Sequence, residues 1–123
     1  MHILLTGLNH ETSTLETREK VSFTQDQIPE ALALLSDHVG EGIILSTCNR
    51  TEIYAVVQDP QKAAGEIHQF LADFHSLDQS KLDPNLYDLF NQDAISHLFK
   101  VSSGLDSMIL GEYQILGQVR MAL

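Results

Sequence analysis

The stretch Ile43-Ile44-Leu45-Ser46-Thr47-Cys48-Asn49-Arg50-Thr51-Glu52-Ile53-Tyr54-Ala55-Val56-Val57 decides the fold of this chain. Residues 43–45 form a short apolar run that is typical of a buried strand, and residues 51–57 read as a second strand. Residues 46–50 separate the two runs. The stretch therefore predicts two consecutive strands with a short polar connection between them.

Helical patterns lie on both sides of these strands. Thr24-x-x-Gln27 resembles a capping box, and apolar residues follow it at helical spacing until Gly40 interrupts the pattern. Asp59-Pro60 combines an Asp cap with a proline at the first helical position, which predicts a helix after the second strand. At the N-terminus, residues 2–8 predict a strand, and residues 10–23 predict a polar loop with one helical turn.

The second half of the chain adds a loop over residues 75–85, a short strand over residues 86–90, and a helix after Asn91. A last helical pattern begins near Glu112 and runs to Leu123 without a stop signal, which indicates a piece of a longer protein. The order strand–helix–strand–strand–helix–strand predicts one α+β domain of the split βαβ kind.

The composition excludes several classes of protein. The chain has 123 residues, of which 7 are basic and 17 acidic, so its net charge of −10 disfavours a domain that grips a phosphate backbone by itself. No apolar run approaches the roughly 18 residues that a membrane helix needs, and the first residues do not resemble a signal peptide. The single cysteine excludes an internal disulfide framework and a Cys-rich zinc site, and it fits a reducing compartment.

Cys48 is the candidate for chemistry, because it stands at the exit of a strand among hydroxyl, amide and guanidinium groups. A cation beside a thiol favours the reactive thiolate, and Arg50 is close in sequence. A buried structural cysteine next to a surface arginine is the alternative. His97 borders the apolar stripe of its helix, so it is either a histidine at the edge of the core or a base for the thiol.

The remaining histidines give no metal site, since no pair has the i, i+4 spacing of helical ligands. We expect His68 and His75, on the helix that begins at Pro60, to be solvated surface residues. Gly40-x-Gly42 lacks the third glycine of a dinucleotide loop, so the chain is not expected to bind a nicotinamide cofactor by itself.

Three blocks of this sequence together resemble the N-terminal catalytic domain of the glutamyl-tRNA reductase family. They are Gly7-Leu8-Asn9-His10-Glu11-Thr12, the stretch from Leu45 to Tyr54, and the run from His97 to Val119. The resemblance spans nearly the whole chain, 1–123, and departs from the family where Tyr113 stands in place of a common proline. It implies a ferredoxin-like βαββαβ core with an antiparallel sheet, followed by the start of a long C-terminal helix.

The resemblance also implies an activity. The family reduces glutamyl-tRNA to glutamate-1-semialdehyde with NADPH, in the first step of heme and chlorophyll (tetrapyrrole) biosynthesis. It implies a cytoplasmic homodimer whose NADPH-binding and dimerisation domains are absent from this chain, with no metal and no membrane contact. The implied partner is the aminoacylated end of glutamyl-tRNA, and a downstream aminomutase is a candidate partner.

Roles for individual residues follow from the same resemblance. Cys48 matches the nucleophile that forms a thioester, and His97 matches an essential histidine that acts as base or proton donor. Arg50 is implied to bind the carboxylate of the glutamyl side chain, and Glu112 suits its α-ammonium group. The further substrate-contacting positions are Thr47, Asn49, Ser107, Tyr113, Gln114 and Gln118.

Two other functions stay open at this level. One is a docking module that keeps the fold without the chemistry, although the presence of Cys48, Arg50 and His97 argues against it. The other is a stand-alone Cys–His thioesterase, which would cleave simple thioesters without preferring glutamyl-tRNA. Fast labelling of Cys48 by a thiol reagent at neutral pH would count against the docking module.

Overall fold

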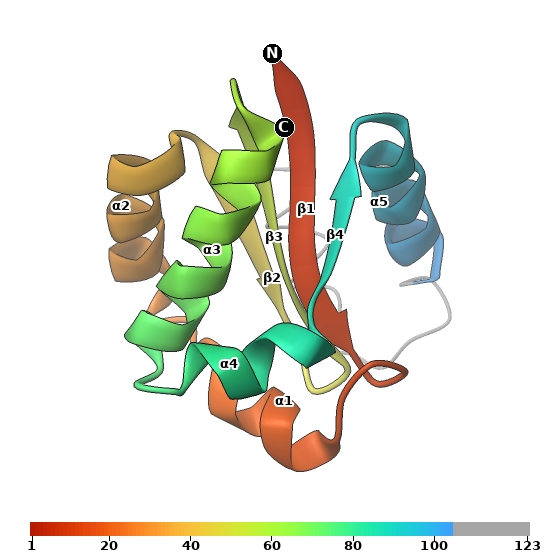
Figure 1. The fold of residues 1–123 in the computed structure, drawn as a ribbon. Coiled ribbons are helices and arrows are strands. Elements are labelled where there is room, and N and C mark those ends of the chain that lie inside the picture. Colours follow the sequence, from red (N-terminus) through yellow and green to blue (C-terminus); the bar gives the residue numbers. More distant parts are fainter. Residues whose placement is uncertain (105–123) are drawn as a thin grey trace.

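Four antiparallel strands form the centre of the computed structural model, which describes residues 1–104 (Figure 1). In sheet order they are β2 (Gly42–Ser46), β3 (Arg50–Val57), β1 (His2–Asn9) and β4 (Tyr87–Phe90). β3 lies between β1 and β2, so the connection from β1 to β2 spans a strand that is inserted later, as in a split βαβ unit. The predicted α+β class with an antiparallel sheet is confirmed.

Helices cover both faces of the sheet. Side chains alternate along β1, so Leu4 and Leu8 point to one face and Leu5 to the other. The first face packs against α2 (Ile28–Val39) and α3 (Pro60–Phe74), and we call it the α2–α3 face. The opposite face, which we call the α5 face, packs against α5 (Gln92–Gly104) through Ala94 and Leu98.

The predicted Asp59 cap of α3 is confirmed, whereas the N-cap residue of α2 is Gln27, which has no side-chain cap. Thr24 and Gln27 exchange two hydrogen bonds just before α2: the Thr24 amide donates to Gln27 Oε1 at 2.9 Å, and the Gln27 amide donates to Thr24 Oγ1 at 3.3 Å. At α3, the Asp59 carboxylate accepts from the Lys62 amide at 3.3 Å. The Asp59 carboxylate satisfies an amide that a helix start leaves without an intrahelical partner, whereas Thr24 and Gln27 close a turn that precedes α2.

Two loop predictions are wrong in part. Residues 10–23 contain α1 (Leu15–Val21), a longer helix than one turn, whose first amides are capped by Thr14. Residues 75–85 contain α4 (Gln79–Leu82), capped by Asp78, and the 3₁₀ helix η1 (Asp83–Asn85). These helices are too short to show an apolar period, and caps and tertiary packing stabilise them instead.

The expectation that His68 and His75 are solvated is also wrong. The His68 side chain is only 15% exposed, and its ring bridges Asp83 through Nδ1 and Asp88 through Nε2, both at 3.0 Å. Thr6 Oγ1 donates to the same Asp88 carboxylate. His75 packs edge-on against the ring of Phe23, with ring centroids 4.6 Å apart.

The bridge from His68 predicts a pH-dependent stability. The hydrogen bond to Asp88 raises the pKa of His68 above its ordinary value, and burial only partly opposes this. A raised pKa in the folded state stabilises the fold at pH values below about 6.5, and this contribution is lost as the pH rises through the folded pKa. We therefore expect His68→Gln to cost about 1 kcal/mol of unfolding free energy at pH 5.5, and clearly less at pH 9.

Urea unfolding of both proteins at the two pH values checks this prediction. The difference between wild type and variant removes the contribution of His75, whose pKa burial lowers and which therefore acts with the opposite sign. A cost of His68→Gln that is equal at both pH values would show that His68 is not charged in the folded protein at the lower pH.

Candidate active site at the β2–β3 connection

Cys48 lies exposed in a tight turn between β2 and β3, at the end of the sheet where α1 also lies (Figure 1). The Thr47 amide donates to the Arg50 carbonyl at 2.7 Å. In return, Thr47 Oγ1 accepts from the amides of Asn49 and Arg50, at 3.0 and 3.1 Å. Thr47 therefore holds the backbone on both sides of the thiol, which keeps an exposed nucleophile in a defined position.

Arg18 of α1 fixes the same turn from outside. Its Nε donates to the Cys48 carbonyl at 3.0 Å, and its Nη1 donates to the Ser13 carbonyl at 2.7 Å. The Arg18 guanidinium thus contacts the backbone of Cys48, 30 residues away in the sequence, and joins this turn to the loop that contains Ser13. No pattern in the sequence indicated this contact.

Glu52 is the residue of this region that the sequence analysis missed. It is fully buried on the α5 face of β3. Four side chains surround its carboxylate: Tyr54 OH lies 3.1 Å from Oε1, while Tyr87 OH, His97 Nε2 and Arg50 Nη1 lie 2.5, 2.5 and 3.5 Å from Oε2. We call these five residues the Glu52 cluster. In the sequence, Glu52 stands between Thr51 and Ile53 in a predicted strand. That local pattern does not indicate a buried carboxylate with four partners.

A glycine makes room for this cluster. Gly7 of β1 pairs with Glu52 on one side and with Tyr87 of β4 on the other, so the three residues form one row across the sheet. A Cβ atom on Gly7 would lie 2.6 Å from the Thr51 carbonyl oxygen and 2.8 Å from Glu52 Cγ. The Glu52 side chain therefore occupies the space above Gly7, where it reaches Tyr87.

The cluster brings two predicted site residues together. Arg50 follows Cys48 by two positions, and His97 comes from α5, yet both contact Glu52 Oε2. His97 therefore lies on the same face of the sheet as Arg50, with a side chain that is 20% exposed. That Cys48 and His97 act on one substrate stays a prediction. The remaining predicted positions lie outside the described residues: Ser107, Glu112, Tyr113, Gln114 and Gln118.

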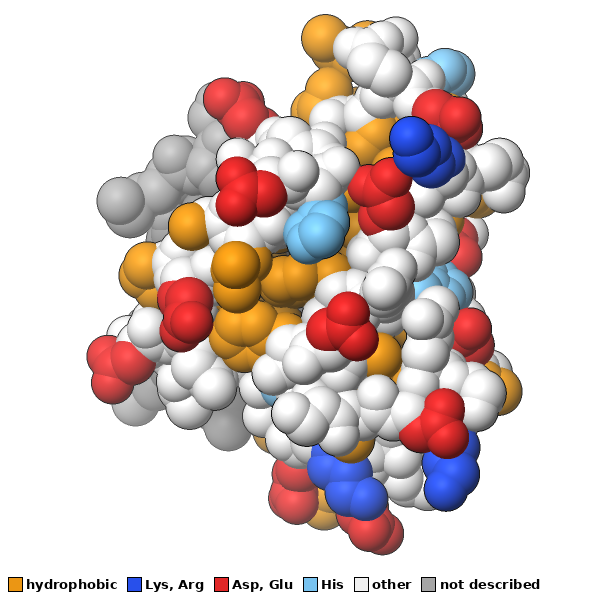
Figure 2. Space-filling view, turned by 60° about the vertical axis from the view of Figure 1, so that its left-hand side comes forward, with side chains coloured by type: hydrophobic (Ala, Val, Ile, Leu, Met, Phe, Trp, Pro, Cys, Tyr) orange, Lys and Arg blue, Asp and Glu red, His pale blue; other side chains and the backbone are white. Residues whose placement is uncertain are grey.

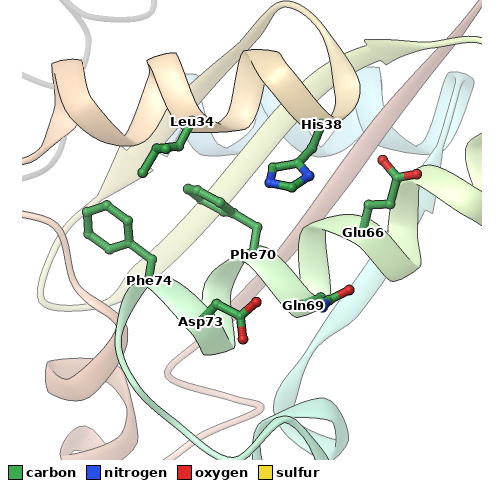
Figure 3. A pocket seen from close by; sticks show the side chains of 7 residues that line it. All are labelled: Leu34, His38, Glu66, Gln69, Phe70, Asp73 and Phe74. Carbon is green, nitrogen blue, oxygen red and sulfur yellow. The ribbon is translucent and has the colours of Figure 1, made fainter.

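A separate hollow of about 290 Å³ lies between α2 and α3. Figure 2 shows its apolar floor among acidic side chains, and Figure 3 shows Leu34 and Phe70 facing each other across it. None of the predicted site residues lines this hollow. Its lining residues are Leu34, His38, Glu66, Gln69, Phe70, Asp73 and Phe74. The hollow lies on the α2–α3 face of the sheet, whereas the Glu52 cluster lies on the opposite, α5 face.

Within residues 1–104, no group of three or more His, Cys, Asp or Glu side chains is arranged to hold a metal ion. Among the same residues, no helix has the length and apolar character that crossing a membrane requires.

Comparison with known proteins identifies a family to which this chain is similar. The family model described as "Glutamyl-tRNAGlu reductase, N-terminal domain" matches residues 6–123. Glutamyl-tRNA reductases of Syntrophotalea carbinolica and Pseudoalteromonas translucida are 47% and 48% identical to the chain. Each alignment covers 99% of this chain, but only 28% and 29% of the relative. The chain thus spans less than a third of the length of these relatives.

A solved structure agrees with the family match. Glutamyl-tRNA reductase from Methanopyrus kandleri superposes on the chain with a TM-score of 0.62 at 30% sequence identity. The match covers 98% of this chain and 27% of that protein. The sheet and its covering helices are therefore similar to one part of a larger enzyme.

Proposed function

Since the chain belongs to the glutamyl-tRNA reductase family, we propose that it is the domain that takes the glutamyl group from glutamyl-tRNA for reduction to glutamate-1-semialdehyde. The observation that carries this proposal is the exposed Cys48 in a turn held by Thr47 and Arg18, together with the convergence of Arg50 and His97 on Glu52. The relatives imply a place in tetrapyrrole biosynthesis.

The proposed reaction begins at the thiol. Cys48 Sγ, as a thiolate, attacks the ester carbonyl that joins glutamate to the terminal ribose, and a C–S bond forms while the C–O bond breaks. The ribose oxygen leaves with a proton, for which His97 is the proposed donor. The thioester that remains accepts hydride more readily than a carboxylate, so the covalent step divides a difficult reduction into two easier ones.

No residue of this chain is assigned to NADPH, because Gly40-x-Gly42 lacks the third glycine of a dinucleotide loop. The hydride that NADPH supplies in the proposed reaction would come from another part of the protein. With a net charge of −10, the chain also leaves most contacts to the tRNA phosphates to other parts. A cytoplasmic homodimer and an aminomutase partner belong to the same proposal.

Arg50 is the proposed contact for the glutamyl side chain. Its guanidinium has five N–H donors, and within residues 1–104 only Nη1 has a side-chain partner, at 3.5 Å from Glu52. Among the described residues the other donors have no side-chain partner, and their planar geometry suits a two-point contact with a carboxylate. A neutral glutamine side chain would leave such a group unpaired, which favours glutamate over glutamine.

Arg50 variants test this proposal with charged tRNA. Arg50→Lys keeps the charge but loses the planar fork, so we expect glutamyl-tRNA deacylation by the chain to fall roughly 10- to 100-fold. Arg50→Gln should in addition narrow the difference between the rates for glutamyl-tRNA and glutaminyl-tRNA. Lys62→Gln, which removes an exposed positive charge at the start of α3, serves as the control for net charge.

Unchanged rates and unchanged preference in both Arg50 variants would remove Arg50 from the site. Cleavage of simple thioesters at the same rate as glutamyl-tRNA would favour the thioesterase instead. A chain that accelerates neither reaction and whose Cys48 reacts slowly with thiol reagents would favour the docking module.

A further inference from the structure

The Glu52 cluster contains a fully buried carboxyl group whose surroundings all point to one protonation state. Burying a charge is costly unless hydrogen bonds and opposite charges compensate it. Glu52 has three hydrogen-bond partners within 3.1 Å and the Arg50 guanidinium at 3.5 Å. A carboxylate at this place can accept from every one of these neighbours, which compensates the cost of burying its charge.

Both tyrosine hydroxyl groups can donate a hydrogen bond to Glu52. Burial, followed by the charge of Glu52 itself, raises the pKa of Tyr54 and of Tyr87 far above the ordinary value. Both hydroxyl groups therefore keep their protons and direct them to the carboxylate. Arg50 has donors and no acceptor. Three of the four neighbours can thus donate to Glu52, and for Arg50 donation is the only role.

The fourth neighbour is His97, and the contact determines which ring nitrogen carries the proton. The distance from His97 Nε2 to Glu52 Oε2 is 2.5 Å. Within residues 1–104, the His97 ring makes no other hydrogen bond. Since a carboxylate cannot donate, Nε2 must hold a hydrogen. In a neutral imidazole the other nitrogen, Nδ1, then carries the free lone pair.

We infer that Glu52 is a positioning residue for His97, which it holds in the Nε2–H tautomer with Nδ1 as the nitrogen that exchanges protons with the reacting groups. The inference rests on the proposed function only for what His97 does with that nitrogen. Nδ1 takes the proton of the Cys48 thiol, and the imidazolium that forms is stabilised by the Glu52 carboxylate. The same proton then passes to the leaving ribose oxygen, so that the ring returns to its starting state.

The cluster also couples two functions through one carboxylate. Glu52 holds His97 on one side and Arg50 on the other, and Tyr87 packs beside the His97 ring with centroids 5.7 Å apart. Because the glutamate is buried and held by two tyrosines, it can fix the base and the carboxylate-binding guanidinium relative to each other. Gly7 is part of this device, since its missing side chain lets Glu52 reach Tyr87.

The tautomer can be measured directly in the ¹⁵N-labelled chain by long-range ¹H–¹⁵N NMR of the histidine rings. We expect His97 to show a protonated Nε2 and an unprotonated Nδ1 when neutral, whereas exposed His10 shows the average of a mixture. In Glu52→Gln the two His97 signals should move toward that average. Glu30→Gln, the same change at an exposed position, should leave His97 unaltered.

Kinetics give a second readout. Glu52→Gln should lower kcat for deacylation of glutamyl-tRNA at least about 10-fold, as expected when a base adopts the wrong tautomer. Glu30→Gln, at an exposed position outside the cluster, should change kcat by less than about threefold. If Glu52→Gln does not fold, the spectrum of the wild-type chain still decides the tautomer.

A wild-type His97 with the proton on Nδ1, or with a mixture like that of His10, would overturn the inference whatever the activity. The expected tautomer in a wild-type chain that does not deacylate glutamyl-tRNA would refute the proposed function and leave the positioning of His97 by Glu52 standing. A Glu52→Gln variant with the wild-type tautomer would also overturn the inference.

Discussion

Cys48→Ser is expected to reduce deacylation of glutamyl-tRNA by this chain to the spontaneous rate. Without a hydride donor, the proposed thioester can only be resolved by water, which releases free glutamate and tRNA slowly. A serine hydroxyl is barely ionised at neutral pH and cannot replace the thiolate. Because Cys48 is exposed and makes no side-chain contact that stabilises the described fold, the substitution should leave the urea midpoint unchanged.

The measurement is the release of labelled glutamate from charged tRNA by wild type and variant, against a sample without protein. Low salt is the appropriate condition, because the acidic chain binds tRNA weakly. A labelled adduct on the wild-type chain that hydroxylamine removes would identify the thioester, and Cys48→Ser should not form it. Equal deacylation by both proteins would mean that Cys48 is not the acyl acceptor.

Gly7→Ala is expected to have the largest effect on stability, about 3 kcal/mol. The new methyl group would meet the Thr51 carbonyl oxygen at 2.6 Å and Glu52 Cγ at 2.8 Å. Neither neighbour can move freely, since one is strand backbone and the other is a fully buried side chain with several hydrogen bonds. The strain should therefore displace Glu52 and disturb His97 as well.

Urea unfolding followed by circular dichroism measures this cost. Gly65→Ala is the matched control, because Gly65 lies in α3 with no atom near its added Cβ. Alanine there should stabilise the chain by about 0.5–1 kcal/mol through its helix propensity. A Gly7→Ala variant as stable as wild type would contradict the position of Glu52 above Gly7.

Local signals account for what could be predicted of the fold. The Asp59-Pro60 pair specifies the start of α3, and Thr24 and Gln27 form a turn just before α2, both through contacts within four residues. The short apolar runs of β2 and β3 predict strands for the same reason. The short helices α1 and α4 were not predicted, because each depends on one capping side chain and on packing against the rest of the fold.

Among the candidate site residues, Cys48, Arg50 and His97 could be named from sequence, but their arrangement could not. The local setting of Cys48 in a polar turn is visible in the sequence, and the family blocks single out His97. No spacing of residues in the sequence indicates that His97 contacts Glu52. The same holds for His68, whose aspartate partners lie 15 and 20 residues away.

By itself, then, the sequence determined the antiparallel α+β architecture, the place of the thiol in a polar connection between two strands, and the family, whereas the exposure of Cys48 came from the structure. Each depends on residues close together along the chain or on their order. Only the tertiary structure decided that Glu52 is buried, that Gly7 must lack a side chain, and that His97 donates from Nε2. Those facts arise where β1, β3, β4 and α5 meet, and a contact between distant segments exists only once the chain has folded.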